Sequence, residues 1–188
     1  MKDKNENRYD DVILNKDDVF QNIEEYKIDD CITILNNDCF YECENLKEIE
    51  IPNSVKEIDE DCFGWCIDLT KIEIPNSVTK IGSWCFNECI NLKEIEIPNS
   101  VKKIGDKCFN GCHSLTKINI PNSVTKIGSY CFCDCSNLKE IEIPNSVKEI
   151  GENCFNWCEN LTKIEIPNSV TKIGEECFIG CTSLTKLN

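Results

Sequence analysis

Sixteen cysteines in 188 residues are the first side chains of this protein whose chemistry needs an interpretation. Fourteen of them form seven Cys-Phe-x-x-Cys pairs, which are Cys39/Cys43, Cys62/Cys66, Cys85/Cys89, Cys108/Cys112, Cys131/Cys135, Cys154/Cys158 and Cys177/Cys181. Structural zinc sites favour two residues between paired ligands, so this three-residue gap speaks against zinc. Because the chain lacks alanine, cysteine fills the small apolar role. We expect buried, reduced thiols, and disulfides between neighbouring repeats or metal binding are the alternatives.

The other reactive residues give little support for catalysis. His113 is the only histidine and Arg8 the only arginine, although acid–base and phosphate-handling enzymes rely on these residue types. Cys31 and Cys133 fall outside the paired pattern, and Cys133 is the candidate for a more exposed thiol that either reacts or stays idle on the surface. We therefore expect no enzyme, no catalytic residue, no cofactor and no bound metal.

A repeat of 23 residues positions these side chains. The same tetrapeptide, Pro-Asn-Ser-Val, begins at Pro52, Pro75, Pro98, Pro121, Pro144 and Pro167. Residues 28–188 hold seven periods of 23 without a gap or an insertion. Self-similarity at a fixed period is typical of solenoids, in which each repeat buries its apolar face against its neighbours.

One unit, residues 46–68, contains the elements that we expect in every repeat. Residues 46–51 end in the alternation of a half-buried strand, and Pro52 ends the strand because it has no N–H to donate. A turn and a second extended stretch follow. The spacing of the Cys-Phe-x-x-Cys segment and the leucine after it predicts one face of a short helix of about two turns. Gly82 and its equivalents predict a turn or a positive φ.

Stacking in register places equivalent residues in files, with neighbours about 4.8 Å apart. One outward file alternates in charge and predicts exposed ion-pair ladders: Glu48, Lys71, Glu94, Lys117, Glu140, Lys163 and Lys186. The next file carries Glu50, Glu73, Glu96, Glu142 and Glu165, with Asn119 and Asn188 in the remaining positions. Because five like charges in one file repel one another, we predict a stripe that receives a basic protein or peptide. Simple repeat copying, with flanking lysines that offset the charge, and a metal-ion array are the alternatives.

The pattern Leu-x-x-Ile-x-Ile-Pro-x-Ser-Val-x-x-Ile-Gly-x-x-Cys-Phe-x-x-Cys resembles the BspA-like leucine-rich repeat family, over roughly residues 20–188. Cysteine stands where that family usually has alanine before the phenylalanine. The resemblance implies an α/β fold: a right-handed leucine-rich-repeat solenoid with a parallel β-sheet on one face and short helices or turns on the other. It also implies a non-catalytic protein-binding or scaffold module that uses the sheet face. A structural or adhesion protein that acts through self-assembly or surface display is the alternative.

Both ends of the chain depart from the repeat. We expect residues 1–27 to form an N-terminal tail with a degenerate cap, and residues 28–188 to form one solenoid domain of seven repeats. Counting a first strand near residue 23, the solenoid has eight parallel strands at 23-residue intervals. The cap argues for a genuine start, whereas the last coil stops inside a strand and leaves apolar residues uncovered. We therefore predict a homodimer through the C-terminal coil at Phe178, Leu184 and Leu187.

Charge and hydropathy narrow the partners and the compartment. With 34 acidic and 20 basic residues, the net charge of −14 argues against binding to nucleic acid phosphates. The opening residues lack the apolar core of a signal peptide, and no apolar run of about 18 residues predicts a membrane span. We expect a cytoplasmic protein with reduced thiols, and surface display by an unrecognised route is the alternative.

Overall fold

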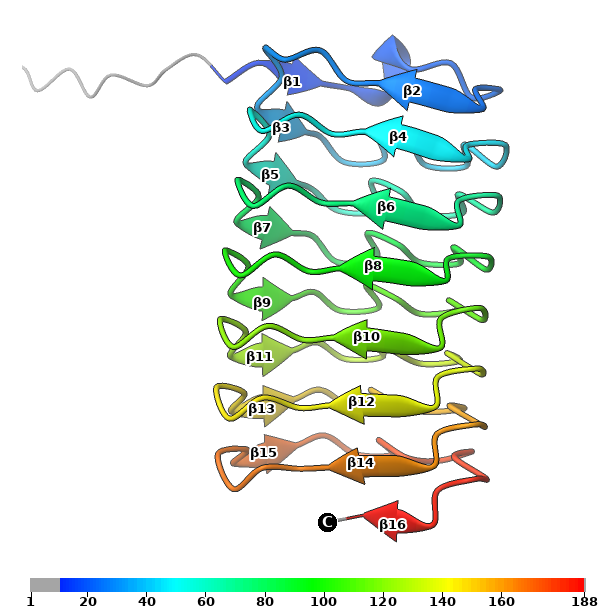
Figure 1. Cartoon of the computed structure of the whole chain (residues 1–188), viewed down its shortest axis with the longest axis vertical. Helices are drawn as coiled ribbons and strands as arrows, with labels where there is room; N and C mark the ends of the chain where they lie inside the picture. Colours follow the sequence, from blue (N-terminus) through cyan, green and yellow to red (C-terminus); the bar gives the residue numbers. More distant parts are fainter. Residues whose placement is uncertain (1–10, 188) are drawn as a thin grey trace, which may run out of the picture.

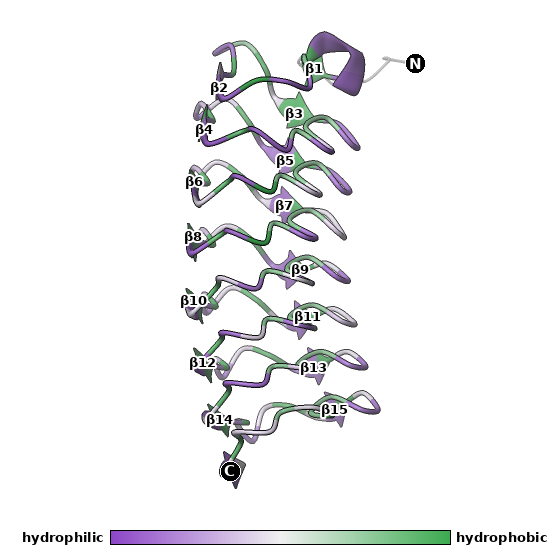
Figure 2. Cartoon of the chain, turned by 90° about the vertical axis from the view of Figure 1, so that its right-hand side faces the viewer, coloured by the Kyte–Doolittle hydropathy of each residue, from purple (hydrophilic) through white to green (hydrophobic). Residues whose placement is uncertain are grey.

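The computed structural model describes residues 11–187, which wind into one solenoid with two strands in each coil (Figure 1). As the chain descends in Figure 1, the even-numbered strands run from right to left in front and the odd-numbered strands return behind them, which is a right-handed winding. Figure 2, turned by 90°, places the even-numbered strands along one edge and the odd-numbered strands on the other side of each coil. The predicted right-handed solenoid of parallel strands is confirmed.

Each strand recurs at the same place in successive coils. The even-numbered strands are β2 (Glu25–Lys27), β4 (Glu48–Glu50), β6 (Lys71–Glu73), β8 (Glu94–Glu96), β10 (Lys117–Asn119), β12 (Glu140–Glu142), β14 (Lys163–Glu165) and β16 (Lys186–Leu187). The odd-numbered strands are β1 (Ile13–Leu14), β3 (Ile34–Leu35), β5 (Glu57–Ile58), β7 (Lys80–Ile81), β9 (Lys103–Ile104), β11 (Lys126–Ile127), β13 (Glu149–Ile150) and β15 (Lys172–Ile173). The eight predicted strands are the even-numbered ones, and the second extended stretch supplies the odd-numbered set.

Strands pair in parallel with their equivalents in the next coil. The odd-numbered strands form one eight-stranded sheet, β6 to β16 form a six-stranded sheet, and β2 pairs with β4. The register is unshifted: Ile118 lies opposite Ile141, and Asn119 lies opposite Glu142. Because side chains alternate between the two faces of a strand, this register keeps apolar files inside and charged files outside.

The helix expected over each Cys-Phe-x-x-Cys segment is absent, and turns take its place. Within residues 11–187 the only helix is a short 3₁₀ segment, η1 (Lys16–Asp18), so the α part of the α/β prediction is wrong. Two residues in each coil adopt a left-handed backbone, as Trp84 and Glu88 do with φ of 61° and 57°. Their turns aim N–H groups at the next coil, where Phe86 donates to the carbonyl of Cys108 at 2.9 Å. These bonds compensate for a conformation that is costly for residues with a Cβ.

The described part of the chain has no helix with the length and apolar character that crossing a membrane requires.

The glycine that follows five of the odd-numbered strands permits close packing between coils rather than a positive φ. A Cβ at Gly105 would lie 2.7 Å from the carbonyl oxygen of Gly82 in the preceding coil. The glycines with positive φ, Gly111 and Gly180, occupy another position of the repeat. Of the two alternatives expected at Gly82, a turn or a positive φ, the positive φ is wrong, and Gly82 instead lies between the end of β7 and the turn that starts at Ser83.

One apolar core runs along the axis of the solenoid. Seven phenylalanine rings stack with centroids 5.2–5.7 Å apart: Phe40, Phe63, Phe86, Phe109, Phe132, Phe155 and Phe178. At the N-terminal end Tyr26 packs edge-on against Phe40, with ring centroids 5.2 Å apart. Leu14 and Val19 are buried beside the first coil, as a cap requires, whereas Phe20 is 83% exposed.

Candidate binding surface on the even-numbered strands

Strand alternation presents charged side chains on the outer face of the even-numbered strands. In β8, Glu94 and Glu96 are exposed, and Ile95 between them is buried in the core. Lys93, directly before the strand, is also exposed. Each coil repeats this arrangement, so the face carries three charged or polar columns over an apolar layer.

The five glutamates predicted to bind a partner lie in one file, which we call the acidic stripe: Glu50, Glu73, Glu96, Glu142 and Glu165. The register places Glu73 opposite Glu96, and Glu142 opposite Glu165. Asn119 lies between Glu96 and Glu142 in the same file. All five carboxylates are exposed. Asn188, the last member predicted for this file, lies outside the described residues.

Lysines neutralise three members of the acidic stripe. The three ion pairs are Lys27–Glu50 at 3.0 Å, Lys71–Glu73 at 2.9 Å and Lys163–Glu165 at 2.7 Å. Hydrogen bonding to Glu73 raises the pKa of Lys71, and hydrogen bonding from Lys163 lowers the pKa of Glu165. Lys71 and Lys163 pair along their own strands, where a two-residue step keeps both side chains on one face. Within residues 11–187 no ion pair joins two members of the alternating file from Glu48 to Lys186, so the ladder predicted for that file is not formed.

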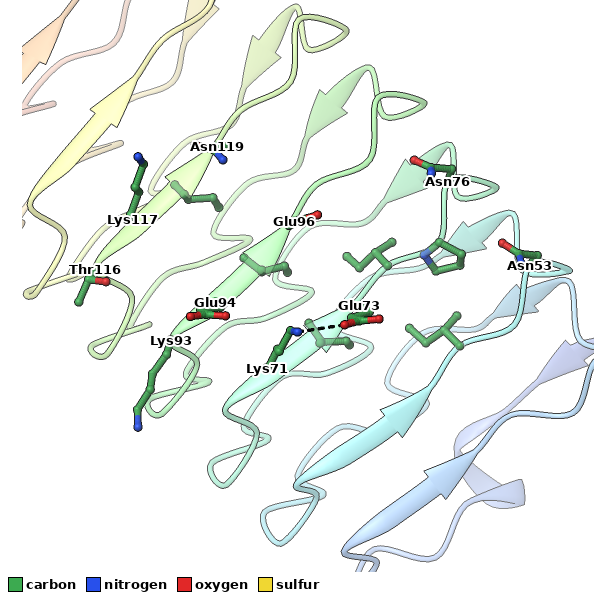
Figure 3. A pocket seen from close by; sticks show the side chains of 16 residues that line it. Asn53, Lys71, Glu73, Asn76, Lys93, Glu94, Glu96, Thr116, Lys117 and Asn119 are labelled. Carbon is green, nitrogen blue, oxygen red and sulfur yellow. Dashed lines mark hydrogen bonds and ion pairs between the residues drawn. The ribbon is translucent and has the colours of Figure 1, made fainter.

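Glu96 and Glu142 have no ion-pair partner among the described residues. A shallow depression of about 670 Å³ lies over β6, β8 and β10 and includes Glu96 and Asn119 in its lining. Figure 3 shows Glu94, Glu96 and Asn119 along neighbouring strands, with a dashed line only between Lys71 and Glu73. The centre of the face thus carries carboxylates that are free to meet an external cation.

The paired cysteines lie in the core rather than on this surface. Thirteen of the fourteen are buried and Cys181 is half-buried, which confirms the predicted burial. The second cysteine of a pair donates to a backbone carbonyl of the preceding coil, as Cys112 does to Phe86 at 3.2 Å. Burial raises the pKa of Cys43 to about 11 and that of Cys89 to about 12. These thiols are protonated at neutral pH, so they are poor nucleophiles and poor metal ligands.

The two cysteines outside the pairs are more accessible, but their surroundings do not activate them. Cys133 is half-buried, as its aberrant position predicts, and burial followed by Asp134 raises its pKa. Cys31 is exposed, and its hydrogen bond with Asp29 raises its pKa. Neither thiol therefore has the lowered pKa of a reactive cysteine.

The titratable groups of residues 11–187 do not converge on a centre. His113 Nε2 lies 3.6 Å from Asp134, and both side chains are partly exposed. No group of three or more histidine, cysteine or acidic side chains within this range is arranged to hold a metal ion. The acidic stripe is a line of separate carboxylates, which suits an extended partner better than a single ion.

The last coil leaves part of its apolar interior open. Ile173 is 46% exposed, whereas the equivalent Ile150 in the preceding coil is 1% exposed. Phe178 and Leu184, two of the residues predicted to self-associate, are half-buried against the core. The side chain of the third, Leu187, lies outside the described residues.

A second charged surface lies on the odd-numbered strands, and none of its outward residues was among the predicted site residues. Lysines and threonines alternate just before these strands, from Lys56 and Thr79 through Lys102 and Thr125 to Lys148. The signal was available in the sequence, because these residues recur 23 positions apart.

The family model described as BspA type Leucine rich repeat region matches this chain in six copies, over residues 17–115 and 102–188. A search of curated proteins gives no match. Among solved structures, a leucine-rich repeat protein from Eubacterium ventriosum is 30% identical with a TM-score of 0.77, over 87% of this chain and 44% of its own. One from Bacteroides ovatus is 28% identical with a TM-score of 0.65, over 89% of this chain and 56% of its own.

A leucine rich cell surface protein from Faecalibacterium prausnitzii is also similar. It is 27% identical with a TM-score of 0.50, over 88% of this chain and 59% of its own. The chain therefore spans about half the length of the solved proteins that it resembles.

Proposed function

Because the chain belongs to the BspA-type leucine-rich repeat family, we propose that it is a non-catalytic protein-binding module that uses the outer face of the even-numbered strands. The observation that carries this proposal is the pair Glu96 and Glu142, two exposed carboxylates without an ion-pair partner among the described residues, on the central strands β8 and β12. Repeat solenoids present such extended faces to partners, and uncompensated charge favours a partner of opposite sign.

The spacing of these carboxylates defines the partner. Glu96 and Glu142 stand one coil to either side of Asn119, so about 10 Å separates their strands. One cation does not span that distance, so the partner supplies two. In a polyproline II segment, which has three residues per turn and rises about 3.1 Å per residue, lysines or arginines three positions apart lie on one side and meet this spacing. We therefore assign a basic, extended segment of a protein as the ligand.

The test is binding of a short peptide with lysine at every third position and glycine between, measured by calorimetry at low salt. Glu96→Gln with Glu142→Gln should weaken binding about tenfold, because two charge-assisted contacts lose their charge. Glu50→Gln with Glu165→Gln removes the same charge from stripe members that already pair with Lys27 and Lys163, so a smaller loss is expected.

Glu57→Gln with Glu149→Gln on the opposite face is the control, and it should leave the affinity for this peptide unchanged. If all three double variants lose the same affinity for the peptide, the effect comes from net charge alone and the proposed site is rejected. A wild-type protein that does not bind the peptide at low salt would reject the basic ligand.

The exposed interior of the last coil favours a second candidate, self-association of two copies through the C-terminal coil. Ile173, at 46% exposure, and half-buried Phe178 and Leu184 supply the apolar contact. Sedimentation at tens of micromolar protein should then detect a dimer, and Ile173→Lys should dissociate it. Val12→Lys, at the opposite end of the solenoid, should have no effect. A monomer at these concentrations would reject this candidate.

The cellular location of the chain is proposed from a similar protein. The Faecalibacterium prausnitzii protein is described as a cell surface protein, and this supports surface display for the present chain over the cytoplasmic expectation. Surface display agrees with a module that meets its partner through one long exposed face. Protease treatment of intact cells, with the chain detected by antibody, distinguishes the two locations.

A further inference from the structure

The face opposite the acidic stripe is basic, although the chain as a whole carries a net charge of −14. Seven lysines lie on or directly before the odd-numbered strands, and we call them the lysine face: Lys56, Lys80, Lys102, Lys103, Lys126, Lys148 and Lys172. The acidic residues on or directly after the same strands include Glu57, Asp59, Glu60 and Glu149. Seven of the chain's 20 basic residues thus lie on one surface, where they outnumber the acidic residues of the same strands, and this surface is separate from the face of the proposed function.

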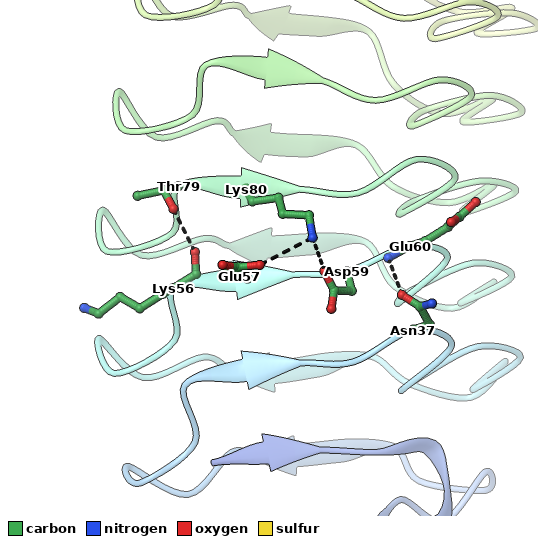
Figure 4. Close-up of polar contacts among 7 residues, drawn as sticks. All are labelled: Asn37, Lys56, Glu57, Asp59, Glu60, Thr79 and Lys80. Atoms are coloured by element: carbon green, nitrogen blue, oxygen red, sulfur yellow. Dashed lines mark hydrogen bonds and ion pairs between the residues drawn. The ribbon is translucent and has the colours of Figure 1, made fainter. Parts of the chain in front are cut away.

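Internal ion pairs leave the middle of the lysine face uncompensated. Lys80 pairs with Glu57 and Asp59, as Figure 4 shows, and Lys126 pairs with Glu149 at 3.0 Å. Within residues 11–187, Lys102, Lys103 and Lys148 have no such partner. Lys103 also lies directly opposite Lys126 in the neighbouring strand. Like charges in register destabilise a sheet, and an external anion would relieve their repulsion.

The surface around these lysines offers further hydrogen-bonding groups. A depression of about 340 Å³ is lined by Lys80, Lys102 and Lys103 together with Ser83 and Thr79, and its lining also includes the carboxylates Asp59, which pairs with Lys80, and Glu60. Thr79 and Thr125 alternate with the lysines, and each hydroxyl donates to the carbonyl of the lysine one coil earlier at 3.3 Å, which leaves its oxygen free to accept.

The order of these groups along the axis identifies the class of ligand. Lys56, Lys102 and Lys148 recur every second coil, about 10 Å apart, with a threonine hydroxyl in each intervening coil. In a flat β-1,4-linked polyuronate, successive sugar rings turn over, so carboxylates and hydroxyls alternate on one side of the ribbon. Such a chain, lying along the axis of the solenoid, presents a carboxylate to each lysine and a hydroxyl to each threonine.

Other polyanions fit this order less well. Same-side residues of a β-strand peptide recur at about 6.6 Å, which is out of step with coils about 4.8 Å apart. An acidic polyproline II peptide does match every second coil, but it carries no hydroxyls for the intervening threonines. Single-stranded nucleic acids need aromatic platforms for their bases, and the residues of the lysine face include none. We therefore propose that the lysine face binds an anionic polysaccharide of the β-1,4-linked uronate type, in addition to the protein partner of the acidic stripe.

The test measures binding of the full chain to poly-β-1,4-mannuronate, with β-1,4-mannan as the neutral chain of the same linkage and polyglutamate as the peptide polyanion. The wild-type protein should bind the polyuronate, should not bind mannan, and should bind polyglutamate about tenfold more weakly. Binding should weaken as salt rises, because the contacts are between exposed charges.

The matched variants carry substitutions that the repeat itself already uses. K102T/K103E introduces the residue types of Thr79 and Glu57, and should lower the affinity about tenfold or more. K93T/K117E makes the same two changes on the opposite face, copying Thr70 and Glu94, and should change the affinity less than about twofold. K102T/K103E should leave binding of the basic peptide intact, so the two faces can fail independently.

Several outcomes overturn the proposal. If the wild-type protein does not bind the polyuronate at low salt, the proposed ligand is rejected. If K102T/K103E and K93T/K117E lose the same affinity, the proposed site is rejected. If polyglutamate binds as tightly as the polyuronate, the lysine face binds any extended polyanion and the carbohydrate assignment is wrong. If the molecular mass of the protein in solution increases without polysaccharide, and K102T/K103E abolishes this increase, the lysine face binds a second copy of the chain instead.

Discussion

The central coils and the last coil contain the same residue types, yet they bury them differently. Phe109 and Ile127 are fully buried in the middle of the solenoid, whereas the equivalent Phe178 is half-buried and Ile173 is 46% exposed. The difference comes from the neighbours, because a central coil is covered on both sides and the last coil on one. Burial in this protein is therefore a property of the stack rather than of the 23-residue unit.

The first coil, in contrast to the last, is covered by residues outside the repeat. The ring of Tyr26 packs edge-on against Phe40, and strand β1, which contains Leu14, pairs with β3 at the end of the odd-numbered sheet. The apolar interior of the first coil is thus covered, like that of a central coil, whereas that of the last coil is partly exposed. Three measurements test whether coils that are covered on both sides differ in stability and reactivity from the last coil.

The largest effect is expected from the phenylalanine ladder. Phe109→Ala should lower the free energy of unfolding by about 3–5 kcal/mol, because it opens a cavity between two stacked rings. Phe178→Ala should lower it by only about 1–2 kcal/mol, because one side of that ring is already uncovered. Urea unfolding followed by circular dichroism measures both. Equal losses would mean that the last coil is as well covered as the central ones.

Thiol labelling should reproduce the same contrast. Cys181 in the last coil is half-buried and Cys112 in the centre is buried, so maleimide should modify Cys181 about a hundredfold faster in the native protein. Exposed Cys31 should react first and serves as the internal reference. Mass spectrometry of timed samples resolves the three sites. Rapid modification of Cys112 without denaturant would contradict the burial of the central thiols.

The smallest effect concerns Asp61, which occupies the same turn position in an inner coil as exposed Glu176 in the last one. Burial, followed by Asp38 and Glu60, raises the pKa of Asp61 to about 6, and its buried Oδ1 has no hydrogen-bond partner. Between the unfolded pKa of about 4 and the native pKa of about 6, the native state binds more protons, so stability falls as pH rises through this window.

Asp61→Asn should therefore stabilise the protein by about 1 kcal/mol at pH 8, after allowance for the partial exposure of the carboxyl. It should give little gain at pH 4, where Asp61 is protonated in the native state. Thermal unfolding at the two pH values measures the difference, and Glu176→Gln is the control. If stability rises more between pH 4 and pH 6 in the wild type than in Asp61→Asn, the raised pKa of Asp61 is refuted.

The sequence predicted much of the fold and less of the candidate site. The strand at Glu94–Glu96 and the burial of Cys112 follow from local alternation and apolar spacing, which a gapless repeat reproduces in each coil. The helix expected at Cys85–Cys89 is wrong, because apolar spacing does not reveal where backbone N–H groups find acceptors. Phe86 bonds to Cys108 in the next coil, and that partner is 22 residues away.

The same limit applies to the charged surfaces. Equal spacing placed Glu73 and Glu96 in one file, and the register bears out that placement. Spacing did not indicate that Lys71 would pair with Glu73 along its own strand, which leaves Glu96 without a cation. The choice depends on which way a long, flexible side chain turns, and a small difference in free energy decides it.

By itself, the sequence determined the period, the parallel strands and the apolar files, because each of these depends on residue types that recur at fixed intervals. Only the tertiary structure decided the left-handed turns at Trp84 and Glu88, the free carboxylate of Glu96 and the exposure of Ile173. The physical reason is the same in each case. Backbone acceptors, ion partners and covering side chains come from neighbouring coils or rotamers, and the composition of a single unit does not specify them.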